Sequence, residues 1–196
     1  MSDVPNFGEL LAGVIGTLPD SALPGLLCGL ERAAGARYRQ WAEASSGSEA
    51  EMLLACAERE EEISRRVAKL LPTPEAERGA VEACLPDAIA TYRDVFEGLP
   101  LLEQLRIQAA AELQGAAAWR GIADRTDDPQ VRAGLEGCDV LNASGYDVMN
   151  AKPRLARRHR LRIVARGIGD AIATRSIRPA SSLSLSPPPQ GPPELS

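Results

Sequence analysis

Apolar side chains recur every three or four residues along four long stretches of the chain. This spacing puts them on one face of an α-helix, which can bury that face against other helices. Alanine is abundant and aromatic residues make up only 4%, which also favours closely packed helices over sheets. The chain is therefore predicted to be all-α, with long helices over residues 21–46, 48–71, 101–125 and 129–151.

Turn and cap residues divide these stretches into two hairpins. Ser45-Ser46-Gly47 separates the first helix from the second, and Asp127-Asp128-Pro129 separates the third from the fourth. Pro129 suits the first position of a helix, because its missing N–H would have no partner there. Ser48, followed by Glu51 three residues later, predicts a capping box at the start of the second helix.

Shorter elements precede each hairpin. Residues 6–16 predict a short helix that begins at Asn6 as its N-cap. Residues 75–85 predict a partly helical linker, and Pro86 then opens a second short helix that ends near Gly98. A simple up-and-down bundle needs only a short central loop, so this long connection predicts a four-helix bundle with a crossover.

The two halves of the chain align with each other at an offset of 81 residues. Past the first hairpin turn, which is two residues longer than the second, the offset becomes 79 and pairs Glu60 with Asp139. Helix breaks and inward acids coincide in this alignment, which indicates an internal duplication. The identical pairs at the first offset are Pro5/Pro86, Leu18/Leu99, Pro19/Pro100, Glu31/Glu112, Arg39/Arg120 and Ala42/Ala123, and Tyr38/Trp119 is a conservative pair.

Each long helix carries one acid within or beside its apolar stripe: Glu31, Glu60, Glu112 and Asp139. A charged carboxylate in a core is costly unless it is paired or bound to a metal. Four of them at similar depth repel one another unless cations intervene or some are protonated. Inward carboxylates from all four helices are how bundles hold two iron or manganese ions.

This arrangement resembles the ferritin-like superfamily, in particular small rubrerythrin-like proteins built from two hairpins, over about residues 20–150. Their pattern is one Glu on the first helix of each hairpin and Glu-x-x-His on the second. The resemblance implies that Glu31 and Glu112 stand at the single-Glu positions, with Glu60 and Asp139 at the Glu of the second motif. It also implies a dinuclear iron or manganese site, used for iron handling or oxidoreductase chemistry with dioxygen or peroxide.

The chain departs from the family at the histidines. Their positions hold Ile63, which cannot bind a metal, and Asn142, which offers a weaker oxygen ligand. The only histidine, His159, lies outside the bundle. Oxygen ligands favour manganese or ferric iron over zinc. The first hypothesis is therefore an all-oxygen metal site, with the ligands Glu31, Glu60, Glu112, Asp139 and Asn142.

The second hypothesis is a non-catalytic helical protein-interaction module that kept the fold and lost the metal. Its inward acids would pair with arginines such as Arg37, Arg39 or Arg120, or lie at the solvated edge of the bundle. Tyr38, two turns after Glu31, would be a redox-active neighbour of a metal under the first hypothesis and a core aromatic residue under the second.

Charge is distributed unevenly along the chain. Residues 1–151, the predicted bundle, carry 13 Lys and Arg against 25 Asp and Glu, whereas residues 152–196 carry 9 against 2. Residues 152–178 predict a basic helix that docks on the acidic bundle or on a protein partner, including a second copy of the chain; an anionic membrane surface and nucleic acid are the alternatives. Specific nucleic-acid binding is not expected, because stacking aromatics are absent. Residues 179–196 are rich in Pro and Ser and are expected to be disordered.

The remaining features predict a cytoplasmic protein. The N-terminus has no basic and apolar signal segment, and no stretch reaches the roughly 20 apolar residues of a membrane span. The four cysteines, Cys28, Cys56, Cys84 and Cys138, are widely spaced and are expected to be buried thiols in a reducing compartment.

Overall fold

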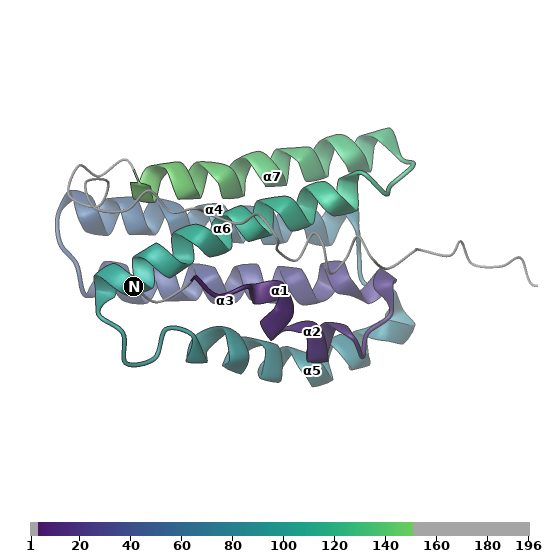
Figure 1. The fold of residues 1–196 in the computed structure, drawn as a ribbon. Helices are drawn as coiled ribbons and strands as arrows, with labels where there is room; N and C mark the ends of the chain where they lie inside the picture. Colours follow the sequence, from purple (N-terminus) through teal and green to yellow (C-terminus); the bar gives the residue numbers. More distant parts are fainter. Residues whose placement is uncertain (1–3, 151–196) are drawn as a thin grey trace, which may run out of the picture.

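The structure is a computed structural model that describes residues 4–150, and these residues fold into helices and their connections, without a strand (Figure 1). The all-α prediction is confirmed for this part of the chain. The predicted basic helix over 152–178 and the Pro/Ser-rich tail over 179–196 lie outside the described residues. The elements are α1 (Phe7–Leu10), α2 (Ala12–Ile15), the 3-10 helix η1 (Asp20–Ala22), α3 (Leu23–Glu43), α4 (Ser48–Leu70), α5 (Glu75–Asp94), α6 (Leu101–Ala123) and α7 (Pro129–Asn150).

The four long helices form the two predicted hairpins. α3 packs along α4, α6 packs along α7, and α4 and α7 join the hairpins (Figure 1). The first turn ends at Gly47, whose φ of 58° is a conformation that residues other than glycine rarely adopt. The second turn ends at Asp128, whose carboxylate accepts hydrogen bonds from the backbone N–H groups of Gln130 and Val131. Pro129 is the first residue of α7, as predicted.

The apolar stripes read from the sequence supply most of the core between these helices. An exception is Leu102, which is 59% exposed at the start of α6. Three of the four cysteines are buried, Cys84 is partly exposed, and all four are free thiols. Burial raises the pKa of Cys28 to about 12 and that of Cys138 to about 11, so these thiols stay protonated. The buried stripe residues include Leu27, Ala34, Tyr38, Trp41, Cys56, Ile63, Val67, Leu105, Ala109, Trp119, Ala123, Leu135 and Cys138.

Helix starts follow the predictions only in part. Asn6 caps α1 as expected, because its side-chain oxygen accepts from the N–H groups of Gly8 and Glu9. The predicted helix over residues 6–16 is broken into two short helices at Leu11, which is buried. The capping box at Ser48 does not form: α4 begins at Ser48 itself, and no side chain caps it.

The crossover is one continuous helix, which corrects the predicted linker and separate short helix. α5 runs through Pro86, and its 20 residues span about 30 Å. Proline has no N–H, so one carbonyl group in the preceding turn lacks its helical hydrogen bond. Pro86 is exposed, so this carbonyl group faces water. Packing on α3 favours the continuous helix, because Gly29 leaves room for Leu85: a Cβ on Gly29 would clash with Leu85 Cδ1.

An aromatic cluster joins the N-terminal segment, α3 and the end of α5. The ring of Phe96 lies 5.2 Å from that of Tyr92, 6.1 Å from that of Trp41 and 6.4 Å from that of Phe7. Arg37 stacks on this cluster, with Cζ 3.9 Å from the centre of the Phe96 ring. Arg37 therefore contacts aromatic rings. The second hypothesis instead predicted that it pairs with an inward acid.

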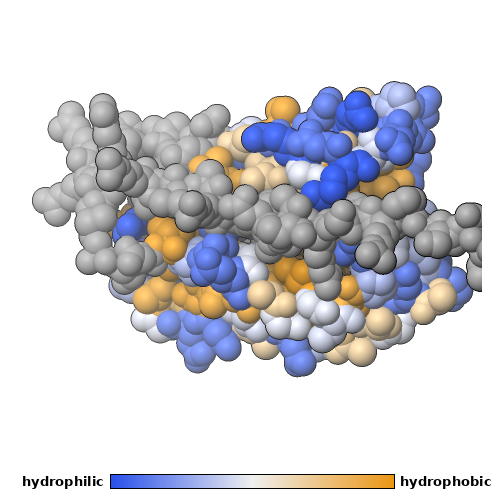
Figure 2. Space-filling model, turned by 45° about the vertical axis from the view of Figure 1, so that its right-hand side comes forward, coloured by the Kyte–Doolittle hydropathy of each residue, from blue (hydrophilic) through white to orange (hydrophobic). Residues whose placement is uncertain are grey.

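The outer surface mixes polar and apolar side chains, and Figure 2 shows this on one face of the molecule. Large exposed apolar residues are spread over four helices, an arrangement that is normal for a protein surface. None of the helices in the described part of the chain is long and apolar enough to cross a lipid bilayer. The exposed residues are Leu10, Leu54, Leu102 and Val140.

We expect Phe96→Ala to lower the free energy of unfolding by about 3–5 kcal/mol, because it removes a buried ring at the centre of the aromatic cluster. Leu102→Ala, which truncates an exposed side chain, should change the free energy by less than about 0.5 kcal/mol. Urea unfolding followed by circular dichroism measures both. Equal stability of the two variants would contradict the role of Phe96 in attaching α5.

Candidate metal centre

Three glutamates meet between the long helices. Glu60 on α4 lies within hydrogen-bonding reach of both Glu31 on α3 and Glu112 on α6. Glu31 and Glu112 each contact Glu60 and act on each other through charge, so the three carboxyl groups form a row with Glu60 in the middle. Glu60 and Glu112 are buried, whereas Glu31 keeps partial contact with solvent. Asn142, buried on α7, contacts both outer glutamates.

Glu112 is held by three hydrogen-bond donors. Tyr38 Oη and Gln108 Nε2 donate to its Oε1 over 2.7 and 2.9 Å, and Asn142 Nδ2 donates to its Oε2 over 3.3 Å. Gln108 is itself oriented by Tyr92, whose hydroxyl donates to the Gln108 side-chain oxygen. This network fixes the carboxylate of Glu112 from three helices, α3, α6 and α7, with α5 behind Gln108.

Glu31 receives a hydrogen bond that mirrors the one from Tyr38 to Glu112. Trp119 Nε1 donates to Glu31 Oε1 over 2.8 Å. The two acids are 81 residues apart (112 − 31), and so are the two aromatic donors (119 − 38). Each half of the chain therefore supplies the aromatic donor for the other half's glutamate, a relation that supports the internal duplication.

Glu60 differs from its neighbours, because neither of its carboxylate oxygens receives a hydrogen bond from any donor among the described residues. Its polar neighbours are the other two carboxyl groups. Two carboxyl groups approach this closely only if a proton or a cation lies between them. Asn142 Oδ1 is a second buried acceptor without a donor. The centre therefore has more acceptors than its own donors can satisfy.

Burial raises the pKa of all three glutamates. Loss of solvent is the largest cause in each case and raises the pKa of Glu31 to about 7. The pKa of Glu60 is raised well above its usual range, first by burial and then by the charges of Glu112 and Glu31. Burial also raises the pKa of Glu112, while the hydrogen bonds from Gln108 and Tyr38 and the charge of Arg59 oppose that rise. Without a cation, the row holds protons near neutral pH.

Two glycines let α6 and α7 approach the centre closely. A Cβ on Gly115 would lie 2.9 Å from Asn142 Nδ2 and 3.9 Å from Glu31 Oε1. A Cβ on Gly145 would lie 3.3 Å from Glu112 Oε2. A side chain at Gly115 would displace the Asn142 amide, and one at Gly145 would press on the Glu112 carboxylate.

The predicted ligands are only partly brought together. Glu31, Glu60, Glu112 and Asn142 meet, but Asp139 is paired with Arg120, whose guanidinium donates to both of its carboxylate oxygens over 2.9–3.1 Å. This pair forms because Arg120 extends along the outside of the hairpin, where it is 60% exposed. Arg39 reaches α4 in the same way and binds Glu61.

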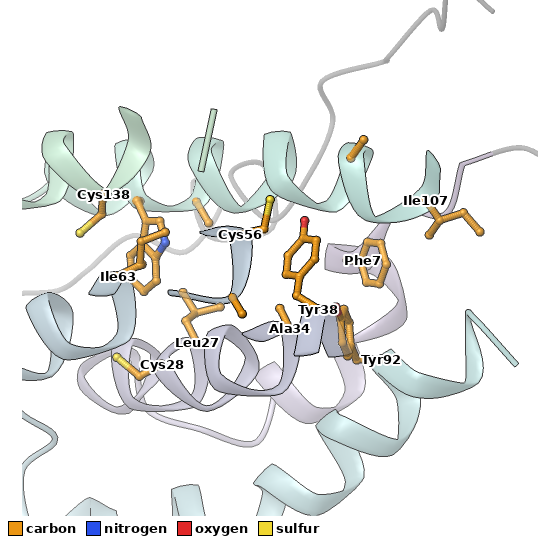
Figure 3. Close-up of a cluster of buried hydrophobic side chains, with 14 of the residues drawn as sticks. Phe7, Leu27, Cys28, Ala34, Tyr38, Cys56, Ile63, Tyr92, Ile107 and Cys138 are labelled. Carbon is orange, nitrogen blue, oxygen red and sulfur yellow. The ribbon is translucent and has the colours of Figure 1, made fainter. Parts of the chain in front are cut away.

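Ile63, at a histidine position of the family pattern, is fully buried among apolar side chains near Cys138 (Figure 3). The sequence reasoning missed Gln108, although a Gln four residues before Glu112 faces the same side of the helix and was the available signal. It also missed Gly115 and Gly145, since glycine within a helix gives no sign of what approaches it.

A small cavity borders the centre. Its volume is about 60 Å³, enough for a few water-sized groups. Apolar side chains form most of its wall, and Figure 3 shows Phe7 and Tyr92 beside Tyr38 at this part of the core. The lining residues are Phe7, Leu11, Leu27, Leu30, Glu31, Ala34, Tyr92, Gln108, Ala111, Glu112, Gly115 and Asn142.

Within residues 4–150, no three His, Cys, Asp or Glu side chains are already arranged to chelate one ion. Comparisons with protein-family models, curated proteins and solved structures found no match. The likeness to ferritin-like proteins therefore rests on this chain's own residues.

We expect the metal-free protein to become less stable as the pH rises from about 5 to about 8. Each glutamate of the row has a folded pKa above its unfolded value of 4.5, so the folded state is favoured at low pH and loses that advantage as pH passes through the folded values. Glu60→Gln replaces the acid without donors by a neutral amide and should add about 1–3 kcal/mol to the free energy of unfolding at the higher pH.

The matched control is Glu58→Gln, because Glu58 is exposed on the same helix. Urea unfolding in the presence of a chelator at both pH values measures the effect. If the control and Glu60→Gln show the same dependence on pH, buried Glu60 is not a source of that dependence.

Proposed function

We propose that the chain is a ferritin-like four-helix bundle that binds iron or manganese through Glu31, Glu60, Glu112 and Asn142. One observation carries this proposal: Glu60 is buried, has no donor among residues 4–150, and lies between two further carboxyl groups. One cation can bind the oxygens of all three carboxyl groups at once, whereas one proton bridges only two carboxyl groups. Carboxylate and amide oxygens are ligands that hard ions prefer.

The charges support one divalent ion better than two. The row carries at most three negative charges, and Arg59 already acts on Glu112 as a nearby positive charge. One divalent ion together with Arg59 balances three carboxylates. A second ion would need further carboxylates, and Asp139, the fourth acid of the family pattern, is paired with Arg120. The dinuclear site that the resemblance implies is therefore less favoured than a mononuclear one.

An iron or manganese ion would supply the centre with oxidation chemistry towards dioxygen or peroxide, or with iron handling, as the resemblance implies. The chain's own residues prepare it for such an ion. Gln108 and Tyr38 fix Glu112 through Oε1, which leaves only the longer bond from Asn142 at Oε2. Trp119 fixes Glu31 in the same manner.

A second candidate is a non-catalytic interaction module that has lost the metal. Two observations favour it: the ion pair of Asp139 with Arg120, and the burial of Ile63 at a former ligand position. In that case the glutamates share protons, and the row is a structural remnant.

Metal analysis decides between the candidates. We expect protein purified from iron- and manganese-supplemented culture to hold about one ion per chain, and titration of the metal-free protein with Mn²⁺ to give the same ratio. The double variant Glu31→Ala with Glu112→Ala should lose at least about 100-fold in affinity, because each removed carboxylate takes away a charged ligand.

The control is Asp139→Asn, which should keep the wild-type ratio and affinity, since Asp139 belongs to the pair with Arg120. Less than half an equivalent of metal, unchanged in the double variant, would favour the interaction module. Two equivalents of bound metal per chain, with one of them lost in Asp139→Asn, would favour the dinuclear site instead.

A further inference from the structure

The cavity beside the row has a chemically mixed lining. Its lining is apolar at Phe7, Leu11 and Leu30 and polar at Glu31, Glu112 and Asn142. The N-terminal segment that contributes Phe7 is tied to α6 through Gln114, whose side chain accepts from Phe7 N over 2.9 Å and donates to Pro5 O over 3.0 Å. The cavity is therefore a built feature of the fold, with one wall held in place by two backbone contacts.

The polar lining of the cavity consists of acceptors, so a ligand that binds there must bring hydrogen-bond donors and positive charge. Asn142 is 2% exposed and lines the cavity, and no donor in the described part of the chain reaches its Oδ1. The glutamates beside it are acceptors, and the described residues offer no ion pair to either of them. A ligand that fits this polar lining carries several N–H or O–H groups and, against carboxylates of low solvation, a positive charge.

We propose that the cavity is a binding site for a short primary alkylammonium ion. Its ammonium group donates to Asn142 Oδ1 and to the carboxylates of Glu31 and Glu112, and its alkyl chain lies against Leu27, Leu30 and Phe7. An ammonium group has three donors, which matches the three acceptors of the polar lining. An alcohol offers one donor and no charge, and a carboxylate ion would be repelled.

The size of the cavity limits the chain length. A volume of about 60 Å³ corresponds to roughly four to six water-sized groups, which matches the five non-hydrogen atoms of n-butylammonium. Longer alkyl chains would exceed this volume. The site therefore selects small amines over long ones.

This inference goes beyond the proposed metal site and does not require it. The organic cation approaches from the cavity, where Glu31, Glu112 and Asn142 are accessible, whereas the metal needs Glu60 in addition. Because the two cations share three ligands, they compete, and excess Mn²⁺ should weaken amine binding by mass action.

Isothermal titration calorimetry of the metal-free full chain, in a phosphate buffer free of amines, tests the proposal. We expect n-butylammonium to bind with one site per chain and at least about ten-fold more tightly than 1-butanol or butyrate, because only the amine brings both charge and three donors. Equal affinity for butanol would show simple apolar binding and overturn the proposal, as would the absence of measurable binding of the amine.

Ala111→Leu fills the cavity from α6 and should weaken butylammonium binding at least about ten-fold. Ala83→Leu, on the exposed side of α5, is the matched control and should bind as the wild type does. If Ala111→Leu does not fold, Leu30→Phe fills the same cavity from α3 and decides the matter. Wild-type affinity in a folded cavity-filling variant overturns the proposal.

A separate Mn²⁺ titration keeps the two proposals apart. Mn²⁺ binding without amine binding would refute this inference alone. Amine binding without Mn²⁺ binding would support it and refute the metal site.

Discussion

The contact between Glu60 and the carboxyl groups on either side governs how the centre of this protein is built. Carboxyl groups that touch in a buried site need a proton or a cation between them, and no donor within residues 4–150 forms a hydrogen bond to Glu60. The outer members of the row are instead held firmly, Glu112 by three donors and Glu31 by an indole N–H. The donors thus fix the two ends of the row and leave the need for positive charge at its middle.

The packing around the row brings the helices close to its carboxyl groups. Gly115 and Gly145 bring α6 and α7 close to the carboxyl groups, and the Ala-rich sequence of α6 keeps that helix thin. α5 contributes from outside through Tyr92, which orients Gln108. The aromatic cluster attaches the end of α5, so the orientation of Glu112 depends on contacts two layers away from the row.

The sequence predicted the fold well where helical periodicity was strong. The two hairpins, the Asn6 cap and the first residue of α7 follow directly from spacing and cap chemistry. It failed at Pro86, because the rule that proline ends a helix is local, whereas the packing of Leu85 into the space left by Gly29 is not. Sequence patterns contain no record of such contacts between distant segments.

The prediction of the site residues was also limited by contacts between distant segments. Spacing placed Glu31, Glu60, Glu112 and Asn142 on inward faces, and the structure brings these residues together. Spacing gave Asp139 the same inward position, because a helical wheel does not include the reach of Arg120 from the neighbouring helix. Whether an acid at the edge of a stripe turns inward or outward depends on such a partner, and partners are known only once the helices are packed.

The exchange of aromatic donors between the halves has a consequence for how such a centre can arise. Tyr38 donates to an acid of the second hairpin, and Trp119 donates to an acid of the first. Among the described residues, each of these aromatic hydrogen bonds therefore crosses from one hairpin to the other. A single hairpin carrying this pattern could receive the aromatic hydrogen bond on its glutamate only by pairing with a second copy. If the chain arose by duplication, its precursor was therefore a symmetric dimer, and fusion joined two subunits that already depended on each other.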